Sequence, residues 1–84
     1  MQIIGIVSRI LIKSTKQLKK RVVIINDTID PQNVWCIEFR KELAEVAGII
    51  QEGDNVKVKF RNEGRIDDHQ NYYNNIIAEK IERL

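Results

Sequence analysis

The segment 39–60 constrains the fold of this chain more than any other part of the sequence. Its first residues end an alternating strand, and residues 42–47 then place apolar side chains at helical spacing. Gly48 follows this helix, where we expect the left-handed conformation that ends many helices. Gly53 and Asp54 indicate a tight turn before another alternating strand. A single short helix between two strands, in a chain otherwise rich in strand signals, predicts a small all-β domain.

Runs of β-branched and alternating residues predict five strands around this helix. We expect the strands at Gln2–Ile12, 20–26, Val34–Arg40, 55–62 and 72–81, the helix at Glu42–Ala47, and polar loops at 13–19 and 63–71. Gly5 inside the first strand predicts a bend or a bulge. The order of elements is that of a five-stranded OB-fold Greek-key barrel with one short helix between strands 3 and 4.

Length and cysteine content bound the class of protein. A chain of 84 residues has room for one domain, residues 1–84, with one modest core. Cys36 is the single cysteine, so no intrachain disulfide is expected, which fits a reducing compartment. We find no signal-peptide pattern and no apolar run long enough to span a bilayer. The sequence therefore predicts a soluble, cytoplasmic protein with no membrane partner.

The sequence offers little for catalysis. His69 is the one histidine, and the adjacent Asp67 and Asp68 lack the spacing of a calcium loop. Cys36 lies within a strand, without a histidine at a spacing that would activate it, and we interpret it as a packing residue. Phosphate-binding loops and nucleophile motifs are also missing. We expect no enzymatic activity, no cofactor and no metal.

Basic residues gather in two predicted loops on either side of one face of the barrel. The formal net charge is only +2, but the first of these loops is a basic run without any acid. Cations along a groove are what a single nucleic-acid strand requires for its phosphates. The candidates are Lys13, Lys16, Lys19 and Lys20 in the first loop, Arg40 on the third strand, and Arg61 and Arg65 at the last hairpin. The alternative is a solvated loop that only keeps the protein soluble.

Aromatic residues, on which bases would stack, are scarce. Tyr72 and Tyr73 are adjacent, so in a strand they face opposite sides and one should be exposed. The exposed one either stacks on a base or merely covers the barrel end. Trp35 alternates with Ile37 and Phe39, and this register places all three in the core and keeps charged neighbours outside. A shift of one residue would instead expose Trp35 and Phe39.

Three strands carry apolar residues on both faces. The outward-facing set in the first two strands comprises Ile4, Ile6, Val22 and Ile24, and Ile76 and Ile77 repeat the pattern in the last strand. Because a small barrel buries one face of each strand, the other set lies either under a loop or against another subunit. We expect a homo-oligomer, a dimer or a tetramer, whose interface includes Ile4, Ile6, Val22 and Ile24.

This chain resembles two protein families. The run Leu43-Ala44-Glu45-Val46-Ala47-Gly48, with Gly53 five residues on and then Val56 and Val58, resembles the bacterial single-stranded-DNA-binding protein family. Nearly the whole chain is also similar to small uncharacterised bacterial and phage OB-fold proteins, at Met1-Gln2-Ile3, Gly5, Lys19-Lys20, Cys36, Glu38, Gly53-Asp54, Asn74, Ile76, Ala78, Lys80, Ile81 and Glu82.

The resemblance implies an OB-fold protein that binds single-stranded DNA, or RNA, with little sequence preference. One departure concerns the third strand, where the single-strand-binding family exposes aromatic residues that stack on DNA. Here Val34, Cys36 and Arg40 occupy the outward positions. The alternative is a protein-protein interaction module that uses the same barrel only as a scaffold and binds no nucleic acid.

Overall fold

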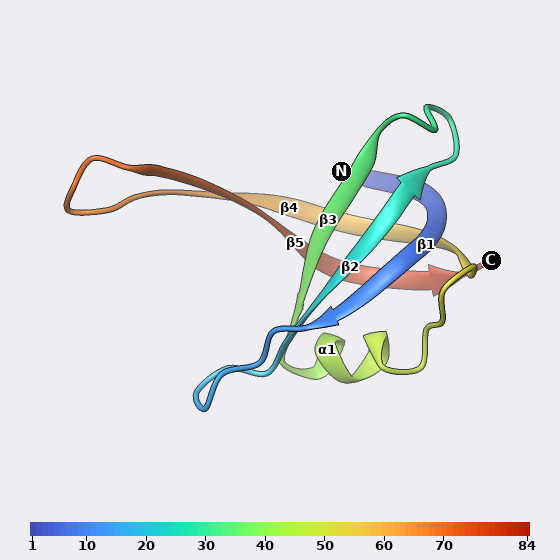
Figure 1. The fold of residues 1–84 in the computed structure, drawn as a ribbon, viewed down its shortest axis with the longest axis horizontal. Helices are drawn as coiled ribbons and strands as arrows, with labels where there is room; N and C mark the ends of the chain where they lie inside the picture. Colours follow the sequence, from blue (N-terminus) through green and yellow to red (C-terminus); the bar gives the residue numbers. More distant parts are fainter.

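The computed structural model describes residues 1–84. Its elements are β1 (Gln2–Ile12), β2 (Lys20–Asp27), β3 (Val34–Arg40), α1 (Glu42–Ala47), β4 (Asn55–Ile66) and β5 (Tyr72–Arg83). The five strands form a single sheet in the order β1-β2-β3-β5-β4, which closes on itself into a ring (Figure 1). All strand pairs are antiparallel except β3 with β5. The predicted order of strands and helix is confirmed.

The core fills the inside of the ring, and alternation along each strand selects its members. On β3, Ile37 and Phe39 are completely buried, and Trp35 packs partly buried against the same core. The predicted register of the third strand is therefore confirmed. Helix α1 covers one end of the ring and buries Ala44 and Ala47 (Figure 1). Complete burial of a large apolar side chain contributes roughly 1.5–3 kcal/mol, so this packing is the main source of stability.

A bulge in β1 explains part of its apolar excess. The pairing of β1 with β2 shifts register between Val7 and Arg9. Beyond the shift Ile10 packs against the core, although the original alternation would have turned it outward. A bend or a bulge was predicted at Gly5, and the bulge lies further along the strand, between Val7 and Arg9. Gly5 is needed for close packing instead, because a Cβ there would lie 2.4 Å from the backbone oxygen of Asn26.

The two glycines that flank the helix-to-strand connection behave differently. Gly53 has a φ of 91°, as the predicted tight turn requires. Gly48 has a φ of −68°, so the predicted left-handed helix end is wrong. At this position a Cβ would meet the guanidinium of Arg21 at 2.5 Å and the backbone oxygen of Glu45 at 3.0 Å. Close approach of neighbours therefore accounts for Gly48.

The last hairpin is longer than the sequence indicated. Residues 63–66 were expected in a loop, but β4 continues through them and pairs with β5 as far as Ile66 opposite Tyr72. Pairing of β4 with β1 covers only residues 55–59, so beyond this point β4 has β5 as its only strand partner. Residues 61–76, which we call the arm, project from the ring as a two-stranded ribbon (Figure 1).

The apolar pair in β5 lies within the monomer. Ile77 is buried and Ile76 packs partly buried against the core. At this point β5 lies between β4 and β3, because Ile77 pairs with both Arg61 and Glu38. The expectation that one face of this strand would need a further cover is therefore wrong for Ile76 and Ile77.

Candidate nucleic-acid interface

Five charged side chains from three strands form a chain of ion pairs beside the base of the arm. Lys20 and Arg40 are cross-strand neighbours on β2 and β3, and both contact Glu38, at 3.3 Å and 2.6 Å. Arg40 also reaches Glu63 on β4 at 3.4 Å, and Glu63 binds Arg61 at 3.1 Å. The structure therefore brings the predicted phosphate ligands Lys20, Arg40 and Arg61 together. Each of them already forms an ion pair with Glu38 or Glu63.

The ion pairs shift the pKa of two members of this cluster, Arg40 and Glu63. Burial acts to lower the pKa of Arg40, but its hydrogen bonds with Glu38 and the charges of Glu38 and Glu63 outweigh this and raise it. The hydrogen bond from Arg61, together with Arg40, lowers the pKa of Glu63. A phosphate that approaches Arg40 must compete with Glu38 and Glu63, which already contact its guanidinium. The cluster holds one more cation than carboxylates, which leaves a weak positive charge for a ligand.

Lys19 also has an acidic partner. Its Nζ lies 2.5 Å from Oε1 of Glu45 on α1, and this hydrogen bond lowers the pKa of Glu45. Both side chains are more than half exposed, so the pair is screened by water and contributes little to stability. Lys19 can leave Glu45 for a phosphate at a small cost. The remaining predicted cations, Lys13 and Lys16 in the β1–β2 loop and Arg65 on the arm, form no ion pair.

The two tyrosines lie at the outer part of the arm. Both are exposed, Tyr72 at 78% and Tyr73 at 45%, whereas only one was expected to be. The hydroxyl of Tyr73 donates a hydrogen bond to Oδ2 of Asp67 at 3.0 Å, which fixes its ring against the hairpin loop. Tyr72 forms no such bond. Tyr72 is therefore the better stacking candidate, because its ring is both more exposed and unattached.

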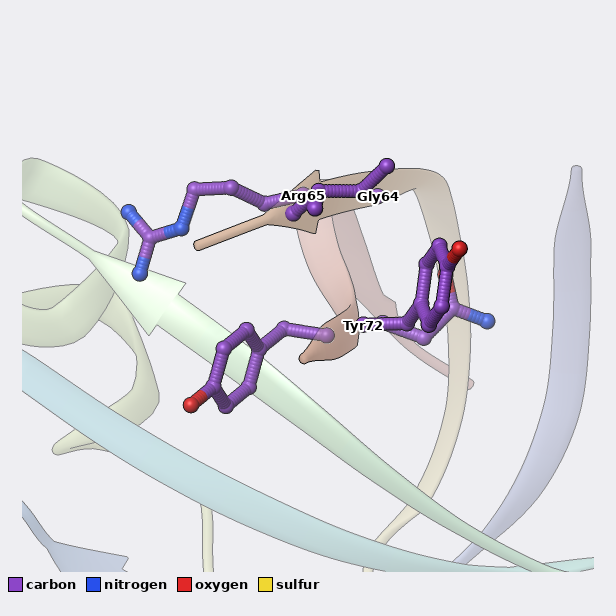
Figure 2. Close-up of a pocket in the computed structure, with 6 residues that line it drawn as sticks. Gly64, Arg65 and Tyr72 are labelled. Carbon is purple, nitrogen blue, oxygen red and sulfur yellow. The ribbon is translucent and has the colours of Figure 1, made fainter. Parts of the chain in front are cut away.

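A hollow of about 660 Å³ lies along this part of the arm (Figure 2). It is lined by Gly64, Arg65, Ile66, Tyr72, Tyr73 and Asn74. Gly64 leaves the hollow open because the nearest atom that a Cβ there would meet is Oδ1 of Asn74, at 3.7 Å. The guanidinium of Arg65 extends from the same short segment (Figure 2). The hollow thus combines a cation with flat aromatic surface, which is the combination that a nucleotide requires.

A second hollow, of about 420 Å³, lies where the arm diverges from the ring. It is lined by Val22, Val34, Trp35, Cys36 and Glu38 of β2 and β3 and by Asn74, Asn75 and Ile76 of β5. We call it the cleft. The outer face of β3 forms one wall and the arm forms the other. The cleft therefore connects the ion-pair cluster at Glu38 with the arm.

Trp35 lines the cleft without exposing its ring fully. Its centroid lies 5.2 Å from that of Phe60, and Nε1 donates a hydrogen bond to Oδ2 of Asp27 at 3.1 Å. This bond is the largest of several that lower the pKa of Asp27. Asp27 and Asp67 each organise a turn by accepting backbone hydrogen bonds; the turn at Asp27 is predicted by its sequence, but the bonds to Trp35 and Tyr73 depend on the fold.

The predicted oligomer interface is divided in the structure. Ile4 and Ile6 on β1 are exposed, at 40% and 38%, while Val22 and Ile24 on β2 are partly covered. Val22 lines the cleft. Ile24 lies between Cys36 on β3 and Arg9 on β1. Of the four predicted interface residues, only Ile4 and Ile6 on β1 therefore present an exposed apolar surface.

Comparison of the chain with protein-family models, with curated proteins and with solved structures found no match. No group of three or more His, Cys, Asp or Glu side chains lies close enough together to hold a metal ion. The structure contains no helix with the length and apolar character that crossing a membrane requires.

Proposed function

We propose that this protein is an OB-fold protein that binds single-stranded DNA with little sequence preference. The strand would run from the β1–β2 loop across the outer face of β3 and along the arm. Single strands of RNA offer the same phosphates and bases and are the other ligand of this chemistry. Two or more copies of the chain would act together, associated through the apolar outer face of β1 and β2.

The observation that carries this proposal is the hollow on the arm. Arg65 and Tyr72 both line it, on opposite faces of the ribbon because Arg65 pairs with Tyr73 and Ile66 pairs with Tyr72, and neither side chain has an ion-pair or hydrogen-bond partner in the chain. A base can stack on an aromatic face whatever its identity, which explains the expected lack of sequence preference. The unpaired Lys13 and Lys16 would bind phosphates at the other end of the surface. In the middle of this surface, Glu38 and Glu63 would lower the affinity for nucleic acid, because a phosphate must displace each carboxylate from its cation.

Fluorescence polarisation of a labelled oligo-dT, at low and at high salt, tests the proposal. Each neutralised phosphate of a single strand contributes a slope of about −0.7 in a log–log plot of affinity against salt. Replacing Lys13 and Lys16 by Ala should therefore flatten the slope by about 1.4. The matched control replaces Lys57 and Lys59 by Ala on β4, which is not adjacent to β2 or β3 in the ring, and should leave the slope unchanged.

The absence of oligo-dT binding at low salt would overturn the proposed function. Equal flattening by the two double variants would show that only net charge matters and that the surface is wrongly placed. An oligo-rU probe in parallel separates a preference for DNA from binding to any single strand.

The second candidate function is a protein-protein interaction module, which the exposed Ile4 and Ile6 favour. Light scattering should report at least a dimer at micromolar concentration. Ile6→Glu should shift the mass toward monomer or cause aggregation, because a charge would enter a dry interface. Self-association without any oligonucleotide binding would favour this second candidate. A monomer with oligonucleotide binding would exclude the proposed role of this face.

A further inference from the structure

A second group of basic side chains lies on the ring, away from the proposed nucleic-acid surface. Its residues come from β1, β4 and β5, which are neighbours in the closed sheet. Gln2 pairs with Lys59, and Lys59 pairs with Lys80, so these three residues form one row across the strands. Lys57 and Glu82 pair in the next row. Because alternate residues of a strand share a face, both rows lie on the outside of the ring.

These five residues line a hollow of about 220 Å³ whose wall contains no apolar side chain. Three of the five are lysines, and Glu82 supplies the one carboxylate. A molecule of liquid water occupies about 30 Å³, so the hollow has the space of roughly seven waters. The hollow is therefore a polar space with a positive lining that suits a small anion.

The charges that line the hollow are not balanced within the chain. The Nζ of Lys80 lies 3.5 Å from Oε1 of Glu82, in an exposed pair that water screens. Lys57 and Lys59 form no ion pair. Lys59 also lies directly opposite Lys80, and like charges that face each other across two strands are destabilising. An anion between these two ammonium groups would replace this repulsion with two attractions.

We propose that the hollow binds a compact anion with at least two negative charges, of the diphosphate class. Each lysine ammonium group is a point charge with three donors, so several can bind the oxygens of one phosphate group without a fixed geometry. The amide of Gln2 supplies further donors at the end of the row. The site uses no residue of the proposed nucleic-acid surface and does not depend on the proposed function.

The lining also distinguishes this ligand from a nucleic-acid strand. No aromatic side chain lies in the wall, so a base has nothing on which to stack. Each internal phosphate of a strand carries a single charge, whereas a diphosphate brings several charges into one small space. The hollow is therefore better matched to a diphosphate than to the backbone of a single strand.

An amide NMR titration of the ¹⁵N-labelled protein with inorganic diphosphate, at constant ionic strength, tests the proposal. The signals of Gln2, Lys57, Lys59 and Lys80 should move and reach saturation together. The signals of the β1–β2 loop should not follow the same curve. Shifts that do not saturate, or that are equally large at all the lysines of the chain, would overturn the proposal.

Two single substitutions separate the site from the net charge of the protein. Lys59→Gln should weaken diphosphate binding at least about fivefold, because it removes a unit charge next to the anion. The matched control is Lys41→Gln, which removes the same charge from an exposed lysine outside the hollow and should leave the affinity unchanged. Equal losses for the two variants would show that only net charge matters and would overturn the proposal.

A charge reversal separates loss of the ligand from loss of the fold. Lys59→Glu places opposite charges on the two strands where Lys59 now faces Lys80. It should therefore raise the midpoint of thermal unfolding in the absence of diphosphate and abolish diphosphate binding. A lower midpoint, or binding as in the wild type, would contradict the proposal.

Two competitors complete the test. A diphosphate group occurs free and within nucleotides, and a parallel titration with ADP distinguishes these sources. Shifts of the same amides with ADP would extend the site to nucleotides, and shifts with inorganic diphosphate alone would limit it to the free anion; both results support the site. Oligo-dT should not displace diphosphate from the hollow. Displacement would make these lysines part of the path of the strand and would overturn the proposal of a separate site.

Discussion

The ring and the arm are built from the same two strands, yet only the ring is packed. Within the ring, β4 and β5 bury Val56, Val58, Phe60 and Ala78. A few residues further on, the same strands expose Ile66 and Tyr72, at 56% and 78%. The ring is determined by burial, because almost every inward position there has apolar neighbours. The arm has no such constraint, so its residues are free to serve binding. Segments with few buried contacts are the ones that open and move at low cost, and functional loops are commonly drawn from them.

The largest contrast should appear in stability. Phe39→Ala in the ring removes a completely buried side chain and should lower the free energy of unfolding by about 3–5 kcal/mol. Ile66→Ala on the arm should change it by no more than about 0.5 kcal/mol, as for other exposed positions. Urea denaturation followed by circular dichroism measures both. Similar losses for the two variants would mean that the arm is part of the same packed unit.

In oligonucleotide binding we expect the opposite contrast, with changes on the arm having larger effects than changes in the ring. Tyr72→Ala should weaken oligo-dT binding by about 1–3 kcal/mol with little change in the salt slope, because stacking releases few ions. Tyr73→Phe is the control, since it removes only the hydroxyl that binds Asp67. Polarisation titrations at two salt concentrations separate the two effects. A loss at Tyr73→Phe as large as that at Tyr72→Ala would assign the effect to the shape of the arm instead of to stacking.

A smaller effect is expected where the arm meets the ring. Glu63→Gln would remove the only carboxylate that pairs with Arg61 and the weaker of the two that pair with Arg40, which stays bound to Glu38. Oligonucleotide affinity should rise at low salt, and the salt slope should steepen by about 0.7 if one further phosphate is bound. The control is Glu79→Gln, an exposed carboxylate on β5 that takes part in no ion pair. Unchanged binding by Glu63→Gln would place the strand away from this cluster.

The smallest effect concerns the pH response of the arm tip. Hydrogen bonds, with the one from the backbone of Asn71 contributing most, lower the pKa of Asp67 below its ordinary value of 3.8. A carboxyl whose pKa is lower in the folded state stabilises the fold above its unfolded pKa, and this contribution disappears as pH falls through the folded value. Amide NMR signals of His69 and Asn71 should therefore titrate with a midpoint below pH 3.8, with the ring unaffected. Asp67→Asn should abolish this titration, and a midpoint above 3.8 would contradict it.

The ring could be predicted from the sequence because burial imposes alternation. The register of β3, the helix at Glu42–Ala47 and the turn at Gly53 all followed from residue patterns. The arm could not, because residues 63–65 are two charged residues and a glycine, which match a loop as well as a strand. Their pairing with β5 is a property of the hairpin as a whole.

The candidate site residues were also predictable only in part. The sequence predicted that one of Tyr72 and Tyr73 would be exposed, whereas both are, and it placed the basic residues of the β1–β2 loop. It did not show that Glu38, Glu63 and Glu45 would pair with four of the predicted phosphate ligands, Lys19, Lys20, Arg40 and Arg61. These partners are 18 to 26 residues apart in several cases, so only the fold brings them together.

The most direct test of the central claim is an amide NMR titration of the ¹⁵N-labelled protein with oligo-dT. The account predicts that the signals that move belong to the arm, residues 61–76, to the β1–β2 loop and to the outer face of β3. The signals of the turn around Gly53, beyond α1, should stay in place. Shifts that centre on that turn, or a spectrum that does not change at low salt, would contradict the claim that the arm and the adjacent face of the ring bind a single strand.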